Sequence, residues 1–277
     1  MTTASPTVAA PWPAVISVPL RLVYGLYAAA VFLAVVVVAL VGVLLLPGLT
    51  ARRGTARIAA RTFFLLAGMP LRLRGRENLP AGQCVVVANH ASYLDGVVMA
   101  AALPPRFGFV IKREMNDVPL AGFLLRRIGS EFVERFNRHK GATDARRVLR
   151  TAASGHSLVF FPEGTFKPEV GLGKFHTGAF AIAARAACPV VPAVIIGTRR
   201  NMPATRVFPR PGAIEVRYGA PILPIASAAP DHDPALALRD RSRAAILSEL
   251  GEPDLENGDI PRFLANGDRP EEARGLE

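Results

Sequence analysis

The residues with the clearest chemical potential are His90 and Asp95, in the stretch Asn89-His-Ala-Ser-Tyr-Leu-Asp95-Gly. A carboxylate that binds one imidazole nitrogen fixes the tautomer of the ring, and the other nitrogen can then accept a proton from an attacking hydroxyl. The pair is therefore a candidate general base. On one continuous helix, a spacing of five residues turns two side chains about 140° apart. The two can meet only if His90 lies in a turn and Asp95 lies in the first turn of the helix that follows.

The pattern Ser92-x-x-Asp95 before the apolar run Gly-Val-Val-Met-Ala-Ala is typical of a capping box, which would produce that geometry. The same pattern also explains Asp95 without any catalysis, as a carboxylate that accepts hydrogen bonds from backbone N–H groups. A His-x4-Asp spacing by itself leaves both interpretations open.

Other kinds of site lack support in the sequence. The five His residues have no paired ligand spacing, so we expect no metal site and no resident cofactor. Ser157, in Gly155-His-Ser157, lacks the second Gly of a nucleophile elbow. Cys84 and Cys188 both lie in apolar runs, and we expect them to be buried, reduced thiols.

Short runs rich in Val, Ile and Phe alternate with helical stretches from about residue 80 onward. The predicted strands are Cys84–Ala88, Phe107–Ile111, Glu131–Val133, Leu158–Phe161 and Val190–Ile196, and the alternation of Ala213–Tyr218 is that of an edge strand. The predicted helices lie near residues 92–103, 117–128, 142–154, 177–187 and 234–250. This alternation predicts an α/β fold with a mostly parallel sheet flanked by helices.

Ligands of open α/β sheets bind beyond the carboxyl ends of the strands, so the residues that follow each strand form the predicted site. They combine a His, a carboxylate and several cations: His90, then Lys112 and Arg113, then Arg135, then Glu163-Gly164-Thr165, then Gly197 to Arg200.

Residues 22–46 form an uncharged apolar stretch, about 37 Å long as a helix and sufficient to cross a hydrocarbon core of about 30 Å. A cleaved signal peptide is the alternative, but the stretch exceeds a usual signal core. One Arg precedes it, and seven arginines follow it before the first acid, Glu77. The positive-inside rule therefore predicts a single-pass anchor in the cell (inner) membrane, with the C-terminal part in the cytoplasm.

The formal net charge of +11 requires an anionic partner, which could be a nucleic acid, an anionic lipid or a phosphorylated substrate. The sequence has no basic helix–turn–helix or zinc-finger spacing, so we expect anionic membrane lipids and no nucleic acid. We divide the chain into a tail (1–21), a transmembrane helix (22–46), a basic juxtamembrane or interfacial helical segment (47–79), a main domain (80–250) and an acidic, flexible tail (251–277). Residues 62–69 of the basic segment fit either an interfacial helix or a core helix of the domain.

Four blocks of the sequence, taken together, resemble the glycerolipid acyltransferase family, which includes the 1-acylglycerol-3-phosphate O-acyltransferases. The blocks are His90-x4-Asp95, Gly129-x-x-Phe132-x-x-Arg135, Phe161-Pro-Glu-Gly-Thr165 and Val191-Pro-Ala-Val194. Each block is common, but the four in this order and spacing are specific, and they cover roughly residues 80 to 220.

The resemblance implies transfer of a fatty acyl group from acyl-CoA or acyl-carrier protein, as co-substrate, to the hydroxyl of a lysophospholipid acceptor. It makes His90 the base and Asp95 its orienting partner. It implies that Arg135 and Glu163-Gly164-Thr165 bind the acceptor, with Gly129 and Lys112 as further substrate-binding candidates.

One departure from the family pattern concerns the acceptor. Family members that act on lysophosphatidic acid often carry Arg directly after Glu-Gly-Thr, where this chain has Phe166 and then Lys167. The headgroup therefore stays open, with 1-acylglycerol-3-phosphate as the first expectation and another lysolipid, such as a lyso-ornithine lipid, as the second. A membrane-anchored lipid-binding protein without catalysis is the alternative of another class.

Overall fold

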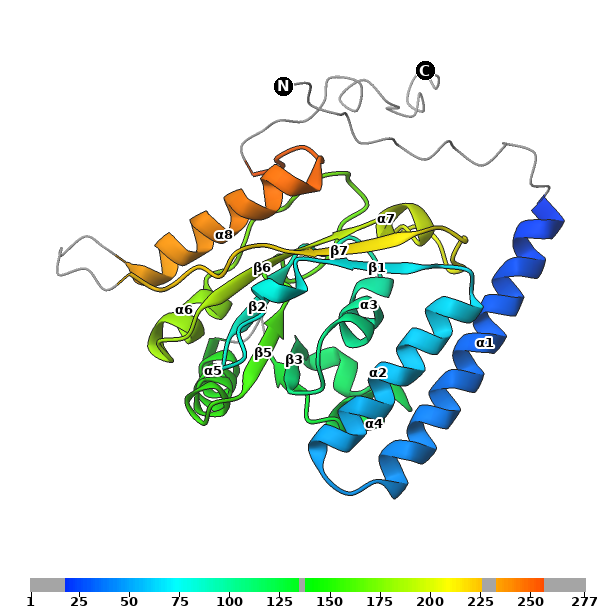
Figure 1. Ribbon diagram of the computed structural model, residues 1–277, viewed down its shortest axis with the longest axis horizontal. Helices are drawn as coiled ribbons and strands as arrows, with labels where there is room; N and C mark the ends of the chain where they lie inside the picture. The colour runs from blue at the N-terminus through cyan, green and yellow to red at the C-terminus, as the bar shows by residue number, and fades with distance from the viewer. Residues whose placement is uncertain (1–17, 135–137, 226–232, 257–277) are drawn as a thin grey trace, which may run out of the picture.

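Seven strands form one sheet in the computed structural model, which describes residues 18–134, 138–225 and 233–256. The strand order is β1-β7-β6-β2-β5-β3-β4, and every neighbouring pair is parallel except β6 and β7 (Figure 1). The strands are β1 (Leu71–Arg74), β2 (Val85–Ala88), β3 (Phe107–Lys112), β4 (Glu131–Val133), β5 (Ser157–Phe160), β6 (Val190–Ile196) and β7 (Ile214–Tyr218). The predicted α/β class with a mostly parallel sheet is confirmed.

The edge of the sheet differs from the prediction. The run Ala213–Tyr218 is not an edge strand, because β7 lies between β6 and β1. The outer strand, β1, comes from Leu71-Arg-Leu-Arg74, which pairs with β7 from Leu71 opposite Ile214 to Arg74 opposite Arg217. Its alternating arginines made it look like part of the basic segment 47–79. The predicted domain boundary at residue 80 is therefore too late.

Two layers of helices cover the sheet, and alternate side chains of each strand enter different cores. Val86, Ala88 and Val191 pack with α2 (Leu49–Leu66) and α3 (Leu94–Ala102) on one face. Val85, Val87 and Val190 pack on the other face with α5, α6 and α8. The three helices on this second face are α5 (Arg138–Ala153), α6 (Gly178–Arg185) and α8 (Pro234–Leu250).

Four short helical segments complete the α/β pattern. The predicted helix near 117–128 is divided: a 3-10 turn, η2 (Arg113–Asn116), follows β3, and α4 spans Ala121–Arg127. The short helix α7 (Thr198–Asn201) begins directly after β6. A further 3-10 turn, η1 (Arg76–Asn78), follows β1.

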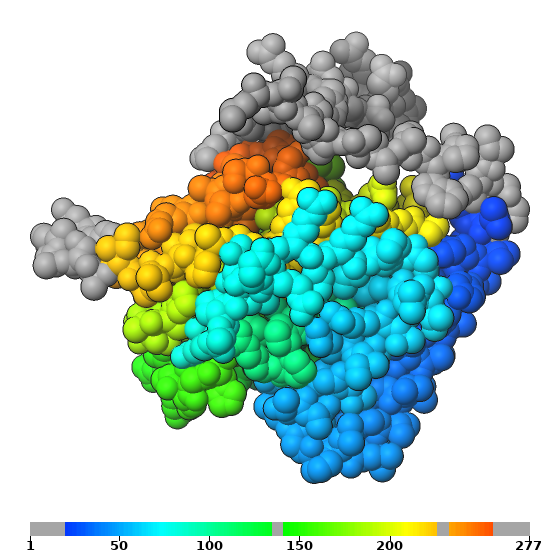
Figure 2. Space-filling view, viewed as in Figure 1, coloured from blue at the N-terminus to red at the C-terminus, as the bar shows by residue number. Residues whose placement is uncertain are grey.

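An apolar helix, α1 (Val18–Leu45), lies beside α2 along one flank of the molecule (Figures 1 and 2). Its stretch Leu20–Leu45 is the one helix in the described part of the chain that is long and apolar enough to cross a membrane. The hydroxyls of Tyr24 and Tyr27 donate to the carbonyls of Ala67 (2.7 Å) and Leu66 (3.0 Å), at the end of α2.

The segment 62–69 belongs to the core of the domain as well as to its surface. Phe63 and Phe64 are buried against the sheet, whereas Leu65 and Leu66 are exposed. Of the two interpretations of this segment, the core helix fits the buried positions of its two Phe side chains.

The acidic C-terminal segment also begins differently from the prediction. Residues 251–256 are not a flexible tail, because Glu252 pairs with Arg199 and Asp254 pairs with Arg243 on α8. Residues 1–17 and 257–277 lie outside the described residues.

Candidate functional site

The turn between β2 and α3 brings His90 and Asp95 together. The Nδ1 atom of His90 lies 2.9 Å from Oδ2 of Asp95, whose side chain is fully buried. The same carboxylate oxygen accepts hydrogen bonds from the backbone N–H groups of Ala91 (2.6 Å) and Ser92 (2.8 Å). Asp95 therefore does both things that the sequence allows: it accepts hydrogen bonds from backbone N–H groups of the turn, and it contacts the imidazole.

Long-range hydrogen bonds fix this turn on the sheet. The side-chain amide of Asn89 donates to the carbonyl of Ile195 (3.0 Å) and accepts from its N–H (2.7 Å), which ties the end of β2 to β6. The hydroxyl of Ser92 accepts from Leu94 N–H (3.1 Å) and donates to the carbonyl of Met202 (2.7 Å). As a result, the backbone on both sides of His90 is held from two directions.

Aromatic side chains enclose the imidazole. Phe161 stacks on it with ring centroids 4.4 Å apart, and Phe166 meets it edge-on at 4.8 Å. Tyr93, which is exposed, packs edge-on against Phe166. The side chain of His90 stays 18% exposed, and within the described residues its Nε2 atom has no hydrogen-bond partner. A reactant can therefore approach Nε2 from solvent.

Glu163 supports His90 from the other side. Its Oε1 accepts the backbone N–H of His90 at 2.7 Å, and its Oε2 accepts the N–H of Gly173 at 2.9 Å. Burial raises the pKa of the Glu163 carboxyl, and the two backbone donors oppose that rise. Of its neighbours, Gly164 takes a positive φ of 81° and Thr165 is exposed.

The structure separates the cations that the sequence placed along this edge. Lys112, at the end of β3, is exposed and has no ion pair among the described residues. Arg113 is tied to Asp144, with Nη2 2.7 and 2.8 Å from the two carboxylate oxygens. Arg199 is tied to Glu252. Arg135 lies outside the described residues.

Gly129 is not brought to this edge. It ends α4 with a φ of 67° and precedes β4, so it lies at the opposite end of the strands from His90. The Nη2 atom of Arg53 donates to its carbonyl at 3.1 Å, and Leu49 packs against its Cα. The prediction that Gly129 contacts substrate has no support from this position.

Two arginines near the site were not identified as structural residues from the sequence. Arg199 was one of several rim cations, and Arg243 was one of many charges on a predicted amphipathic helix. Both are largely buried and saturated with protein acceptors. No local pattern marks such a role, because their partners lie far away in sequence.

The described part of the chain holds no group of three or more His, Cys, Asp or Glu residues arranged for a metal ion. Burial raises the pKa of the Cys84 thiol to about 11, and Cys188 is also buried, so both behave as inert core residues. The chemistry available at this site is therefore that of a His–Asp pair at the carboxyl edge of a mainly parallel sheet.

Comparisons with known proteins agree with this class of site. Residues 70–196 match the family model described as Acyltransferase. The chain is 32% identical over 205 residues to the human 1-acyl-sn-glycerol-3-phosphate acyltransferase alpha, which covers 73% of this chain and 72% of the human protein. A chloroplastic 1-acyl-sn-glycerol-3-phosphate acyltransferase from Brassica napus is 35% identical over 133 residues, covering 47% of this chain.

The crystal structure of the 1-acyl-sn-glycerophosphate (LPA) acyltransferase PlsC from Thermotoga maritima superposes with a TM-score of 0.67. It covers 82% of this chain and 95% of the other, at 22% identity, so this likeness is one of fold. The chain spans 38% of the Brassica napus relative and 57% of a Saccharomyces cerevisiae relative of the same name. On the sequence matches, the chain belongs to the glycerolipid acyltransferase family.

Proposed function

We propose that this protein transfers a fatty acyl group from an acyl thioester to the hydroxyl of a lysophospholipid. The proposed acceptor is 1-acylglycerol-3-phosphate, which gives phosphatidic acid, and the proposed donor is acyl-CoA or acyl-carrier protein. The observation that carries this proposal is the 2.9 Å contact between His90 Nδ1 and Asp95 Oδ2 in the turn beyond β2, where the His90 side chain is partly exposed.

The geometry supports His90 as the general base. Because Asp95 holds the proton on Nδ1, the basic lone pair belongs to Nε2. Nε2 takes the proton of the acceptor hydroxyl while its oxygen bonds to the thioester carbonyl carbon. The carbon–sulfur bond then breaks, and the thiolate takes that proton back from the imidazolium. A thiolate leaves readily, so the positioned base suffices without a covalent acyl-enzyme.

The surroundings of Asp95 suit the charge that forms during the reaction. The carboxylate is fully buried, and three N–H donors converge on one of its oxygens. Such a fixed negative group stabilises an imidazolium more strongly than water would, because it does not need to reorient.

A phosphate on the acceptor suits the cations that follow β3 and β4 in the sequence. Lys112 is exposed at the end of β3, and Arg135 follows β4 in the sequence. Both side chains suit a phosphate, Lys112 as a point charge and Arg135 through its guanidinium fork. We assign Glu163 to positioning, since both of its oxygens bind protein N–H groups, and leave Gly164 and Thr165 as acceptor-binding residues.

The helix α1 supports association with a membrane. Most of its apolar side chains are exposed, among them Leu22, Leu26, Leu33, Val38 and Leu45. Such a surface is stable in lipid and costly in water. An anchor of this kind would hold the site at the depth where a lysophospholipid lies, with Arg52, in the first turn of α2, near anionic headgroups.

The predicted single pass, with the domain on the cytoplasmic side, has a constraint. Near its start, α1 contacts the end of α2 through Tyr24, and near its end the Val43 carbonyl accepts from Arg127 Nη2 at 3.4 Å. A helix that crossed the whole bilayer would bring one of these contacts into the hydrocarbon. Labelling of single cysteines introduced at Leu20 and at Leu46, in sealed vesicles, decides the topology: opposite accessibility supports the pass, and equal accessibility rejects it.

The activity is tested by release of free thiol from acyl-CoA in membranes that contain the wild type, His90→Ala or His156→Ala. Release that depends on lysophosphatidic acid in the wild type and in His156→Ala, but not in His90→Ala, supports the proposal. His156 is an exposed control outside the site. Equal release by all three removes His90 from the mechanism. No release with lysophosphatidic acid, lyso-ornithine lipid or other lysolipids favours a lipid-binding protein without catalysis.

A further inference from the structure

The loop from Phe161 to Thr177, between β5 and α6, carries three residues that contact His90, the first of which is Phe161, stacked on the imidazole. Glu163 accepts the His90 N–H, and the ring of Phe166 meets the imidazole edge-on. The loop has few hydrogen bonds of its own: within the described residues these include Gly164 N–H to the Phe161 carbonyl and His176 N–H to the Pro162 carbonyl. Something else must therefore fix the part between Lys167 and Gly173.

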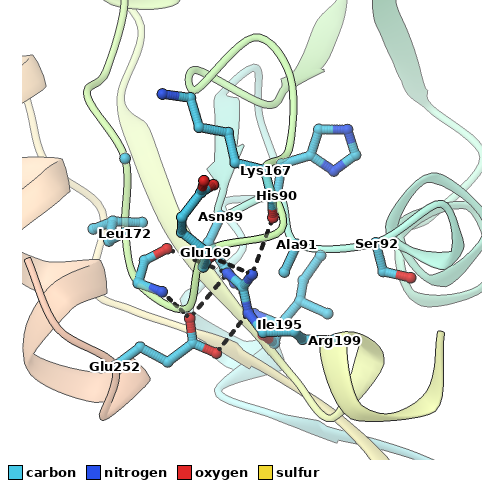
Figure 3. A network of polar contacts seen from close by, with 12 residues as sticks. Asn89, His90, Ala91, Ser92, Lys167, Glu169, Leu172, Ile195, Arg199 and Glu252 are labelled. Atoms are coloured by element: carbon cyan, nitrogen blue, oxygen red, sulfur yellow. Dashed lines mark hydrogen bonds and ion pairs between the residues drawn. The ribbon is translucent and has the colours of Figure 1, made fainter. Parts of the chain in front are cut away.

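Arg199, in the first turn of α7, binds that part directly (Figure 3). Its Nη1 atom donates to the carbonyls of Glu169 (2.7 Å) and Lys167 (3.3 Å), and its Nη2 atom donates to the carbonyl of Gly171 (3.2 Å). Its side chain is only 16% exposed. One guanidinium thus joins three loop carbonyls to the end of β6.

Glu252 completes this arrangement from the C-terminal side. Its two carboxylate oxygens each lie 3.1 Å from Arg199, one from Nε and one from Nη2. The second oxygen also accepts the N–H of Gly171 at 3.1 Å. The pair therefore binds both the N–H and the carbonyl of the same glycine.

The segment 251–256 adds backbone contacts to this pair. Leu172 N–H donates to the Pro253 carbonyl (2.9 Å), and Leu255 N–H donates to the Leu172 carbonyl (3.1 Å). Arg243 on α8 donates to the carbonyls of Leu172 (3.1 Å) and Gly173 (3.2 Å). All of these contacts fall on Gly171, Leu172 and Gly173, and Gly173 is the residue whose N–H binds Glu163.

These arginines are used for geometry and not for capturing an anion. The guanidinium of Arg199 has its charge balanced by Glu252 and its donors occupied by carbonyls, so it offers nothing to a phosphate. Glu252 binds the N–H of Gly171, and two residues further along the backbone the N–H of Gly173 binds Glu163, which in turn binds the N–H of His90. The same loop carries Gly164 and Thr165, the proposed acceptor-binding residues, so its position matters for binding of the acceptor.

We propose that Arg199 and Glu252 are positioning residues that clamp the Lys167–Gly173 part of the loop and thereby place Glu163 and Phe166 against His90, which sets the affinity for the lysolipid acceptor. This inference rests on the acyl transfer proposed above. It assigns to Arg199 and Glu252 a role that neither the family blocks nor the sequence spacing indicates.

The test uses the full chain in detergent micelles with Arg199→Met, Glu252→Gln, the double variant and Arg185→Met. Arg185, at the end of α6, is an exposed control with no described contact to the loop. We expect the acceptor KM to rise about tenfold in Arg199→Met and about threefold in Glu252→Gln. The donor KM and the kcat at saturating acceptor should change less than about threefold. The double variant should match Arg199→Met, because two residues of one clamp are not additive.

Hydrogen exchange provides a readout that does not depend on activity. The amides of Gly171, Leu172 and Gly173, and that of His90, should exchange faster in Arg199→Met and Glu252→Gln but not in Arg185→Met. Unchanged exchange overturns the clamp, and faster exchange with an unchanged acceptor KM overturns its role in acceptor binding. If Arg199→Met does not fold, Glu252→Gln decides by both measurements. If the wild type acylates no lysolipid, the proposed function fails, while exchange still decides whether the clamp holds the loop.

Discussion

Two regions around His90 use their charged side chains in different ways: a first flank at β5 and β6, the two strands on either side of β2, and a second flank at β3 and β4, farther out in the sheet. On the flank formed by β5, β6 and the segment 251–256, the charged groups bind one another and the backbone: Glu163, Arg199 and Glu252 are all occupied. On the flank formed by β3 and β4, Lys112 is exposed and unpaired within the described residues, next to Arg113, which is paired.

This difference separates residues that hold the catalytic His90 in place from residues that are accessible to substrate. The first flank fixes the position of the imidazole, and its charges are neutralised inside the protein. The second flank leaves a cation accessible to an anionic substrate. In the same flank, the Asp144 carboxylate accepts hydrogen bonds from Arg113, Arg147 and the N–H of Glu134. If this is correct, substitutions on the first flank disturb geometry and those at Lys112 disturb affinity.

The largest expected effect is that of Asp95→Asn. The amide oxygen can still accept backbone hydrogen bonds, so the turn should fold, but a neutral group no longer stabilises the imidazolium. We expect kcat/KM to fall by about 10²–10⁴. The measurement is thiol release from acyl-CoA, with Asp240→Asn, an exposed carboxylate on α8, as the control. An Asp95→Asn variant as active as the control would reduce Asp95 to an acceptor of backbone hydrogen bonds in the turn.

Asp144→Asn should affect stability more than activity. Burial raises the pKa of Asp144, but hydrogen bonds from Arg113 and Glu134 N–H and the charge of Arg147 outweigh burial and lower it below 3.8. The stability that Asp144 contributes is therefore present above pH 3.8 and is lost as the pH falls through its lowered pKa. We expect the variant to lose about 2 kcal/mol at pH 7, because both arginines are partly solvated.

Urea unfolding of wild type and Asp144→Asn between pH 3 and pH 7 measures this difference. The gap between the two unfolding free energies should close toward the acid end. A gap that is constant with pH would mean that the carboxylate charge does not contribute, and that the side chain acts by packing alone.

Lys112→Met should weaken acceptor binding. Loss of one charge contact with a phosphate costs about 1.4 kcal/mol, so the acceptor KM should rise about tenfold while kcat stays nearly constant. Lys112→Arg should restore binding because it keeps the charge, and Arg146→Met, an exposed cation on α5, should have no effect. Equal KM values in Lys112→Met and wild type would remove Lys112 from the acceptor site.

Gly129→Ala should give the smallest effect on activity. A Cβ at this position would lie 2.8 Å from Leu49 Cδ1, at a φ of 67° that favours glycine. We expect a loss of about 1–2 kcal/mol in stability with unchanged kinetics. Gly178→Ala, where a Cβ meets nothing within 4 Å, is the control. A changed acceptor KM in Gly129→Ala would contradict the position that the structure gives this residue.

Local patterns predicted the parts of the molecule that depend on neighbouring residues. The capping-box spacing placed His90 in a turn and Asp95 at the start of a helix, where the structure has them. The apolar runs predicted the central strands nearly to the residue, since β-branched side chains buried on both faces leave a continuous signal.

Contacts between distant residues were not predictable in the same way. Leu71–Arg74 alternates over only four residues, and only its pairing with β7 makes it a strand. Gly129 shares a sequence block with Arg135, yet the structure places Gly129 before β4, at the amino ends of the strands and away from His90. Arg199 and Glu252 are 53 residues apart, and nothing local connects them.

From its sequence alone, this protein has a His and a carboxylate in one strand–turn–helix unit, a mostly parallel sheet around it and an apolar helix before it. Spacing and burial period are properties of neighbouring residues, so they can be read directly. Only the tertiary structure decided which cations are free. Whether an Arg or a Lys is paired or exposed depends on which distant segments of the chain pack beside it. Lys112 and Arg113 are adjacent in the chain, but only Arg113 meets a buried carboxylate.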